Sequence, residues 1–388
     1  MKKWVQHSTF WLAIFLMAFP LWHSWIPAER LSSPPLNGYF QVPAPLPLSF
    51  SSWFAMEADS SFQENRTQLA KDSLTWKPGL VRLNNQWKYQ LFRAIDPKRI
   101  IAGKKGYFFG RNDVQDFLGA RFRGEAIIAE EVKKLRKVQD TLAQTGTSLL
   151  YVMAPSKAAF FPQYLPGHLQ PMGAPPTNAA RYRYHLQEES VNVLDVTPWF
   201  KGIQDTCQYP LYPKGGYHWS EYGSWIFTDS LLKRIEHLSG FDLLEEKFVR
   251  MDQTEVPRGA DQDIGKAANL WKDPKAETLA YPIIEVHPFD SSRHHRPKVL
   301  TIGDSYHWTL IGTFVPHRYY AADWRFWYYH KAVWKLNEQL PYTVPEIEAY
   351  AQRLQNFEVI VLIFAEENLY QGMWEFTERA YQAFYPES

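Results

Sequence analysis

Four apolar runs along the chain constrain its fold more than any other feature. They are Ser148–Pro155, Val191–Val196, Val299–Gly303 and Glu358–Ala365. Each run is typical of a strand buried on both faces. Amphipathic helical patterns alternate with the first three runs, over residues 124–145, 179–189 and 221–238. Strands of this kind alternating with helices predict an α/β fold, with a mostly parallel sheet covered by helices on both faces.

Composition narrows the class of protein. The chain has 388 residues and a net charge of +1, so it can bury a real core and has no excess of basic residues for nucleic-acid binding. The single cysteine, Cys207, excludes an intramolecular disulfide. Aromatic residues make up 16% of the chain. This richness fits carbohydrate binding and ordinary core packing equally well. For the cluster Trp324–Trp334 we favour packing in the protein interior over a surface that binds a ligand.

The N-terminal segment predicts a membrane anchor. Lys2 and Lys3 precede an apolar run, Phe10–Ile26, and no small-residue cleavage site follows it. We therefore expect an uncleaved signal anchor over residues 1–27, with the bulk of the chain outside the cytoplasm. Residues 28–95 are then a proline-rich stalk and a helical lead-in, and residues 96–388 form the main domain.

A serine stands directly after one of the predicted strands. Gly303 permits a tight exit from the strand Val299–Gly303, and Asp304 and Ser305 follow it. Reactive groups in open α/β sheets collect beyond the carboxyl ends of strands. The simpler alternative is an ordinary turn, because Asp and Ser are favoured turn residues.

A histidine elsewhere in the chain supplies a partner for this serine. His218 lies in the glycine-containing loop Tyr212–Ser220, directly before a predicted helix. A serine hydroxyl becomes a useful nucleophile when a neighbouring base, usually histidine, takes its proton. A third group normally orients the imidazole. We expect the loop Arg258–Gly265 to line the same site.

Several segments, in this order, resemble one known family. They are Tyr107–Phe109 after Gly106, Ala154–Lys157 with Phe161–Pro166, Tyr217–Gly223 and Val299–Tyr306. Together they resemble the SGNH-hydrolase-like family of the alginate O-acetylation proteins and the related proteins named for an Asp-His-His-Trp motif. The likeness covers about residues 100–370.

The resemblance implies a fold, a location and an activity. Members have the SGNH-hydrolase-like fold, are extracytoplasmic and often membrane-anchored, and move or remove acetyl groups on polysaccharide hydroxyls. They commonly work beside a membrane-bound O-acyltransferase that supplies the acyl group. By position, Ser305 matches the nucleophile and His218 the general base, and Gly303, Asp304 and the Ser305 amide lie at the oxyanion turn.

The sequence departs from the family at one position. Gly216 stands two residues before His218, where the family has an aspartate. Asp263 and Glu221 are candidates to orient His218 in its place, whereas Asp304 is expected to support the turn. An active Ser-His enzyme and a catalytically silent relative therefore both remain open.

No metal or cofactor is expected. His287, His294 and His295 have no acidic or sulfur ligands at metal spacing, which favours a solvated loop. Lys157 is expected at the surface.

The family resemblance implies an O-acetyltransferase for an exported polysaccharide. The alternatives are an acetyl esterase and a silent polysaccharide-binding or assembly protein.

Overall fold

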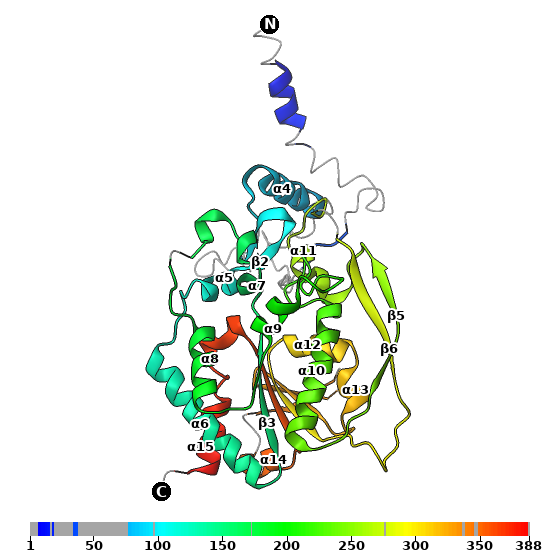
Figure 1. The fold of residues 1–388 in the computed structure, drawn as a ribbon. Coiled ribbons are helices and arrows are strands. Elements are labelled where there is room, and N and C mark those ends of the chain that lie inside the picture. The colour runs from blue at the N-terminus through cyan, green and yellow to red at the C-terminus, as the bar shows by residue number, and fades with distance from the viewer. Residues whose placement is uncertain are drawn as a thin grey trace, which may run out of the picture. The chain divides into compact units, whose positions relative to one another are not determined.

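The computed structural model describes most of the chain in two compact units. It describes residues 7–15, 18, 34–37, 77–95, 98–171, 173–274, 277–335, 338–344 and 348–386. The first unit comprises residues 1–96 and 266–273, and the second comprises residues 97–265 and 274–388. Figure 1 shows the fold of the chain.

The first unit contains helix α4 (Lys77–Phe92) and a short helix over residues 7–15. On α4, the buried Asn85 side chain donates to the backbone oxygens of Ala268 and Asn269, at 2.9 and 3.4 Å. These bonds hold the segment 266–273 to the helix.

The predicted anchor is described only over residues 7–15 and 18, and the predicted stalk and lead-in only over residues 34–37 and 77–95. Among the residues that are described, no helix combines the length and the apolar character that crossing a bilayer requires.

The second unit is built on a seven-stranded sheet. Its strands are β3 (Ser148–Ala154), β4 (Val193–Asp195), β7 (Val299–Gly303), β8 (Arg325–Tyr328), β9 (Ala332–Lys335), β10 (Glu338–Thr343) and β11 (Val359–Ala365). They lie in the order β10-β9-β8-β7-β11-β3-β4. The four predicted apolar runs form the parallel neighbours β7, β11, β3 and β4.

The prediction of a mostly parallel sheet is wrong, because the sheet is mixed. Strand β8 is parallel to β7, but β9 and β10 are antiparallel to their neighbours. Both β8 and β9 come from the aromatic segment Trp324–Trp334. Only residues 329–331 connect them, and a parallel pair needs a crossover of a dozen or more residues. Trp324 and Trp327 are buried, so much of this segment is packed core, as expected.

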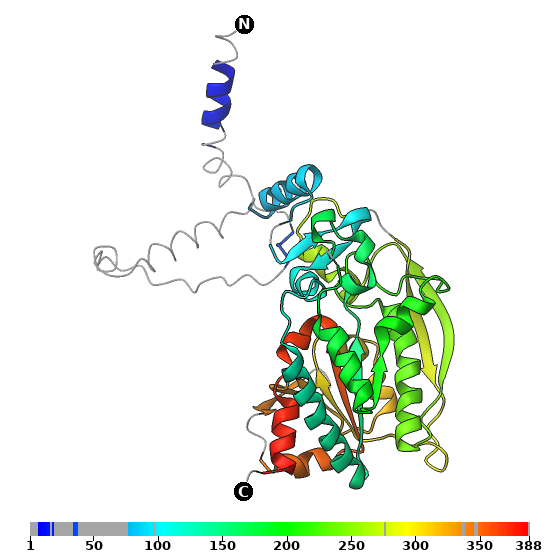
Figure 2. The ribbon, with the colours of Figure 1, turned by 60° about the vertical axis from the view of Figure 1, so that its left-hand side comes forward.

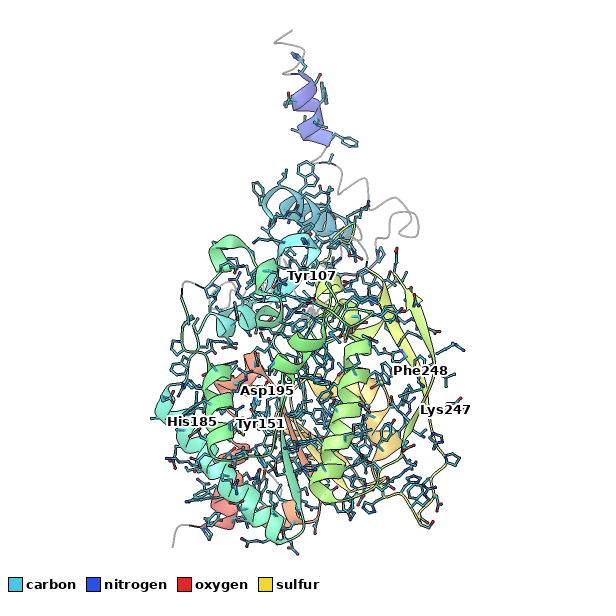
Figure 3. The ribbon with its side chains drawn as sticks, in the orientation of Figure 1. Tyr107, Tyr151, His185, Asp195, Lys247 and Phe248 are labelled. Atoms are coloured by element: carbon cyan, nitrogen blue, oxygen red, sulfur yellow. The ribbon has the colours of Figure 1, made fainter. Side chains whose placement is uncertain are left out.

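Helices cover both faces of the sheet, as predicted. One core cluster contains residues of α6 (Glu125–Gln144), α8 (Asn178–Glu188), α14 (Tyr350–Gln355) and α15 (Phe376–Phe384). The other contains residues of α9 (Val196–Ile203), α10 (Glu221–Ser239), α12 (Tyr306–Gly312) and α13 (Val315–Tyr319). Alternate residues of β3 serve the two clusters: Tyr151, labelled in Figure 3, faces the first cluster, and Val152 faces the second. Figure 2 shows α6 and α15 side by side.

Smaller elements complete the second unit. They are the hairpin of β1 (Ile100–Ala102) and β2 (Phe108–Gly110), the ribbon of β5 (Glu246–Thr254) and β6 (Leu279–Val286), and the short helices α5 (Arg111–Phe117), α7 (Lys157–Phe160) and α11 (Asp263–Ala267). The segment Tyr107–Phe109, which carries part of the family resemblance, lies in this first hairpin. Short 3₁₀ turns cover η2 (Lys104–Gly106), η3 (Pro162–Tyr164), η4 (Gly167–Leu169), η5 (Gly259–Gln262) and η7 (Glu366–Gln371).

Gly303 ends β7 where β7 and β11 approach closely. A Cβ atom at this position would stand 2.2 Å from the backbone oxygen of Ile363 and 2.6 Å from its side chain. Real Cβ atoms do not approach a backbone oxygen this closely. Glycine therefore lets the two central strands set the position of the residues that follow β7.

Gly303→Ala is expected to lower the free energy of unfolding by about 1–3 kcal/mol, because the extra methyl group forces β7 away from β11. Gly312→Ala is the matched control: its Cβ atom meets no atom within 4 Å, and alanine is favoured over glycine inside a helix by roughly 0.5–1 kcal/mol. Urea unfolding of both variants measures the difference. Equal stability of the two variants would contradict the close approach at Gly303.

Candidate active site

Polar side chains gather where the central parallel strands end. Ser305 follows β7, Lys157 follows β3, and Glu366 and Glu367 follow β11. Because the carboxyl ends of parallel strands meet at one edge of a sheet, these groups share the edge where ligands bind in open α/β folds.

Ser305 stands at the start of helix α12, with a half-buried side chain and helical backbone angles. The preceding residue, Asp304, fixes the turn. Its fully buried carboxylate accepts hydrogen bonds from the amides of Tyr306 and Ala365, at 3.0 and 2.7 Å, and from Asn368 Nδ2 at 2.8 Å. Asp304 therefore ties the serine turn to the end of β11, which is the supporting role that the sequence predicts.

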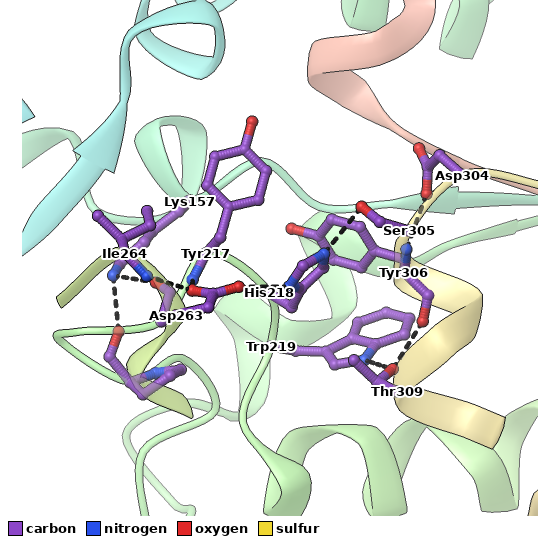
Figure 4. A network of polar contacts seen from close by, with 12 residues as sticks. Lys157, Tyr217, His218, Trp219, Asp263, Ile264, Asp304, Ser305, Tyr306 and Thr309 are labelled. Atoms are coloured by element: carbon purple, nitrogen blue, oxygen red, sulfur yellow. Dashed lines mark hydrogen bonds and ion pairs between the residues drawn. The ribbon is translucent and has the colours of Figure 1, made fainter. Parts of the chain in front are cut away.

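His218 meets Ser305 within hydrogen-bonding distance. Its Nε2 lies 2.9 Å from Ser305 Oγ, although the two residues are 87 positions apart in the chain (Figure 4). This separation falls in the range that a general base needs. The sequence left open whether the two side chains meet, and the structure brings them together.

The other ring nitrogen of His218 contacts Asp263. Nδ1 lies 3.1 Å from Asp263 Oδ2, and the second carboxylate oxygen, Oδ1, accepts from the amides of Tyr217 and Ile264, at 2.8 and 2.6 Å. The carboxylate is thus held in place while one oxygen faces the imidazole. Such contact favours the tautomer that carries its proton on Nδ1 and leaves Nε2 free to accept from Ser305.

Of the two candidates to orient His218, Glu221 is placed elsewhere. It lies in the first turn of α10 and lines a different cavity, together with Trp225 and Phe314. Burial raises the pKa of the Glu221 carboxyl, and the charge of Arg258 opposes this rise. Among the described residues, Glu221 makes no hydrogen bond to His218.

Gly216 explains how the loop that carries Asp263 comes so close. A Cβ atom on Gly216 would stand 2.5 Å from Pro213 Cγ and 2.8 Å from the backbone oxygen of Ala260. An aspartate side chain at position 216 would therefore overlap the segment that precedes Asp263. The loop that carries Asp263 can approach this closely because position 216 has no side chain.

Lys157 binds the backbone of the loop that carries His218. Its side chain is 1% exposed, and its Nζ donates to the backbone oxygens of Pro213, Lys214 and Gly216, at 2.6, 2.9 and 2.7 Å. Three acceptors use all three N–H bonds of an ammonium group. Burial lowers the pKa of Lys157 to about 7, an effect that the charges of Glu277 and Asp263 oppose. The expectation that Lys157 lies at the surface is wrong.

Helix α12 also holds the histidine loop. Trp219 Nε1 donates to Thr309 Oγ1 at 2.6 Å, and the Tyr306 ring meets the His218 ring edge to face, with centroids 4.9 Å apart. Tyr306 is in turn fixed by a 2.8 Å hydrogen bond from its hydroxyl to the Pro155 oxygen. The same helix thus begins at Ser305 and positions the ring that Ser305 meets.

A cavity of about 300 Å³ lies next to Glu366 and Glu367, the two residues that follow β11. Residues from several elements line it, among them Asp116, Ser156, Arg183, Thr197, Glu366 and Glu367. Burial raises the pKa of Glu367, and the charge of Asp113 raises it further. Glu367 accepts a short hydrogen bond from the hydroxyl of Tyr217, the residue before His218. The cavity is therefore linked to the histidine loop through one side chain.

Some residues of this site were not predicted from the sequence. Glu366 and Glu367 follow a predicted strand, as Ser305 does, and that position is the signal by which they could have been found. Lys157 also follows a predicted strand, Ser148–Pro155. Nothing in the sequence indicates that its side chain turns inward, because its three acceptors are backbone oxygens of a loop far along the chain.

Comparison with known proteins identifies relatives. The sequence model of a family described as "SGNH hydrolase-like domain, acetyltransferase AlgX" matches residues 100–315. The probable alginate O-acetylase AlgJ of Pseudomonas putida is 23% identical over 157 residues, which cover 40% of this chain and 39% of that protein. The match thus spans less than half of the length of this relative.

Two solved structures align with most of this chain. The O-acetyltransferase domain of Pseudomonas putida AlgJ aligns with a TM-score of 0.47 and 16% identity, over 72% of this chain and 99% of that domain. Bacillus cereus PatB1 aligns with a TM-score of 0.43 and 12% identity, over 71% of this chain and 99% of its own.

Gly216→Ala is expected to lower the free energy of unfolding by about 1–3 kcal/mol and to speed hydrogen exchange over residues 258–265, because the new methyl group pushes that segment away. Gly215→Ala is the matched control. Its Cβ atom would meet Asp261 O at an ordinary 3.6 Å, so its stability should stay equal or rise by about 0.4–1 kcal/mol. If both variants behave alike, the packing described for Gly216 is wrong.

Proposed function

Because this chain belongs to the family of SGNH hydrolase-like domains of the acetyltransferase AlgX type, we propose that it is an O-acetyltransferase that acts on polysaccharide hydroxyls. In this proposal Ser305 is the nucleophile, His218 the general base and Asp263 the group that orients His218. The domain over residues 96–388 carries the activity.

One observation carries the proposal. A single imidazole joins Ser305 Oγ, at 2.9 Å from Nε2, to the Asp263 carboxylate, at 3.1 Å from Nδ1. An alcohol, an imidazole and a carboxylate in this order form the arrangement that activates serine for acyl transfer on unrelated folds. Both Ser305 and His218 are partly exposed, so a substrate can reach them.

The first half of the proposed reaction acylates the enzyme. His218 Nε2 takes the hydroxyl proton as Ser305 Oγ attacks the acetyl carbonyl of the donor. The tetrahedral intermediate then expels the donor's leaving group, which takes the proton back from His218. The products are acetyl-Ser305 and the protonated donor fragment.

The second half transfers the acetyl group. A sugar hydroxyl gives its proton to His218 Nε2 as its oxygen attacks the ester carbonyl of acetyl-Ser305. Collapse of the intermediate breaks the bond to Ser305 Oγ, which regains the proton from His218. A water molecule in place of the sugar hydroxyl would give acetate, which is the esterase alternative.

The Ser305 amide is the proposed oxyanion donor. The amide of Asp304 is already used, since it donates to the Ile363 oxygen at 3.2 Å. Gly303 contributes differently, by letting β7 approach β11. A donor aimed at the developing oxyanion typically contributes about 3–4 kcal/mol to transition-state stabilisation.

Asp263 favours an active enzyme over a silent relative. The silent alternative depends on the missing carboxylate at Gly216 and on the surplus of aromatic residues. The Asp263 carboxylate, which comes from another loop and lies 3.1 Å from His218 Nδ1, removes the first of these two grounds. Lys157 supports the arrangement, because it fixes three carbonyl groups of the loop that presents His218.

The same proposal includes a location and partners. We infer that the domain works outside the cytoplasm, held at the membrane by the N-terminal segment, and receives acetyl groups from a membrane-bound O-acyltransferase. The acceptor is an exported polysaccharide, whose sugar units can use the cavity lined by Glu367, the residue that accepts from the Tyr217 hydroxyl. The proposed chemistry uses only side-chain and backbone groups of the protein and no cofactor.

Asp263→Asn is expected to lower kcat for an activated acetyl ester about 10⁴-fold, because asparagine cannot stabilise the imidazolium and favours the wrong tautomer. Ser305→Ala should abolish the serine-dependent reaction. Initial rates of 4-nitrophenyl acetate hydrolysis measure both, and circular dichroism verifies that each variant is folded.

Glu221→Gln is the control for this series, since Glu221 makes no hydrogen bond to His218 and should leave the rate close to that of the unmodified chain. A folded Asp263→Asn variant with an unchanged rate would refute the role of Asp263. A rate that survives Ser305→Ala would refute the acyl-enzyme.

Incubation with an acetyl donor and an oligosaccharide acceptor separates transfer from hydrolysis. Transfer predicts acetylated oligosaccharide, measured by mass spectrometry, and less free acetate as the acceptor concentration rises. Release of acetate at a rate independent of acceptor would instead identify an esterase, and absence of both products with folded protein would favour the silent alternative.

A further inference from the structure

Helix α4 exposes an apolar stripe along its length. Leu80, Leu83, Trp87 and Leu91 are 49%, 45%, 62% and 68% exposed. Their spacing of three, four and four residues places them on one face of a helix. Phe92, which ends the helix, is 74% exposed. A helix of a water-soluble domain normally turns such a face toward the core.

The opposite face of α4 is the one that packs within its own unit. Asn85 and Tyr89 are buried there, and Asn85 bonds to the backbone of Ala268. The polar Asn85 is thus inside and the leucine and tryptophan side chains are outside. This inverted pattern is costly in water, so the exposed stripe calls for an apolar environment outside the unit.

The charges of α4 all have one sign. Its charged residues are Lys77, Arg82 and Lys88, Arg93 follows directly, and no acidic residue lies between 77 and 95. The chain as a whole has a net charge of only +1, so this local excess is a property of the helix. A partner of α4 should therefore combine an apolar layer with negative charge.

We propose that α4 lies in the interface of an anionic lipid bilayer, with its Leu80–Leu91 stripe among the acyl chains and with Lys77 and Lys88, which flank the stripe, near the headgroups. Basic amphipathic helices with Trp, Phe and Leu on one face bind bilayers in this way. Tryptophan is favoured at the boundary between acyl chains and headgroups, the depth that this proposal gives to Trp87.

A second copy of the chain fits this surface less well. In a symmetric contact the same patch meets itself, so the basic residues of the two α4 helices would face each other without negative charge. Bilayers rich in phosphatidylglycerol supply apolar and anionic parts together. Because α4 is outside the acyl-transfer site, this inference stands apart from the proposed activity.

The test follows one labelled position in the full chain. An environment-sensitive nitrobenzoxadiazole dye is attached at Leu91→Cys in a Cys207→Ser background, and the chain is reconstituted into protein-free liposomes. The dye should shift to shorter wavelength and resist quenching by dithionite in liposomes that contain phosphatidylglycerol. Both effects should weaken in pure phosphatidylcholine and at high salt.

Two matched variants separate the apolar stripe from the charge. Leu83→Glu and Gln86→Glu add the same negative charge to α4, but only Leu83 lies on the stripe. Glutamate at position 86 keeps the oxygen that accepts from the Lys272 amide at 2.8 Å. Protection of the dye should fall much further with Leu83→Glu than with Gln86→Glu.

A dye at Phe248→Cys serves as the reference, because Phe248 is 49% exposed on strand β5 (Figure 3). If the dye at position 91 is quenched as readily as this reference in anionic liposomes, the proposal is wrong. Protection that requires native membranes and is absent in protein-free liposomes also overturns it, since a membrane protein would then be the occupant.

Discussion

The proposed activity depends on one imidazole placed between an alcohol and a carboxylate. His218 can take the Ser305 proton only if its Nε2 faces the hydroxyl and its Nδ1 carries the other proton, a state that the Asp263 carboxylate favours. Three separate segments must meet to within tenths of an ångström for this to hold. Much of the surrounding structure contributes to that meeting.

Two constraints bring the segments together. The sheet sets the position of Ser305, because Gly303 lets β7 approach β11 and Asp304 ties the following turn to Ala365 and Asn368. The loop of His218 is set by buried polar contacts, above all by the ammonium of Lys157. Replacing one partner of such a buried group leaves the other without compensation, which is why these contacts hold the loop in one conformation.

The glycine at position 216 links the departure from the family to the geometry. A carboxylate two residues before the histidine and a close loop at residues 258–265 compete for the same space. This chain has the close loop, and Asp263 reaches His218 from it. The carboxylate proposed to orient His218 thus comes from a different place in the sequence than the aspartate of the family motif.

The sequence predicted those features that depend on local pattern. The central strands, the helices on both faces and the serine after β7 follow from apolar runs and periodicity. Strand β9 was missed because an aromatic-rich segment has no clear alternation, and β10 was missed because it is mostly exposed and has no buried apolar run. The sequence could not decide whether Asp263 or Glu221 contacts His218, and Lys157 was wrongly expected at the surface. The position of each of these side chains depends on which distant segments of the chain come into contact. Such meetings are set by tertiary packing and leave no periodic signal.

The acetyl-Ser305 intermediate can be detected directly. The chain is mixed with an activated acetyl donor, quenched in acid shortly afterwards, and analysed by intact-protein mass spectrometry and peptide mapping. If Ser305 is the nucleophile, the protein gains the mass of one acetyl group. The peptide that contains Ser305 carries this group and loses it when an acceptor is added. Acetylation confined to lysines or other residues, with Ser305 unmodified while donor is consumed, would contradict it.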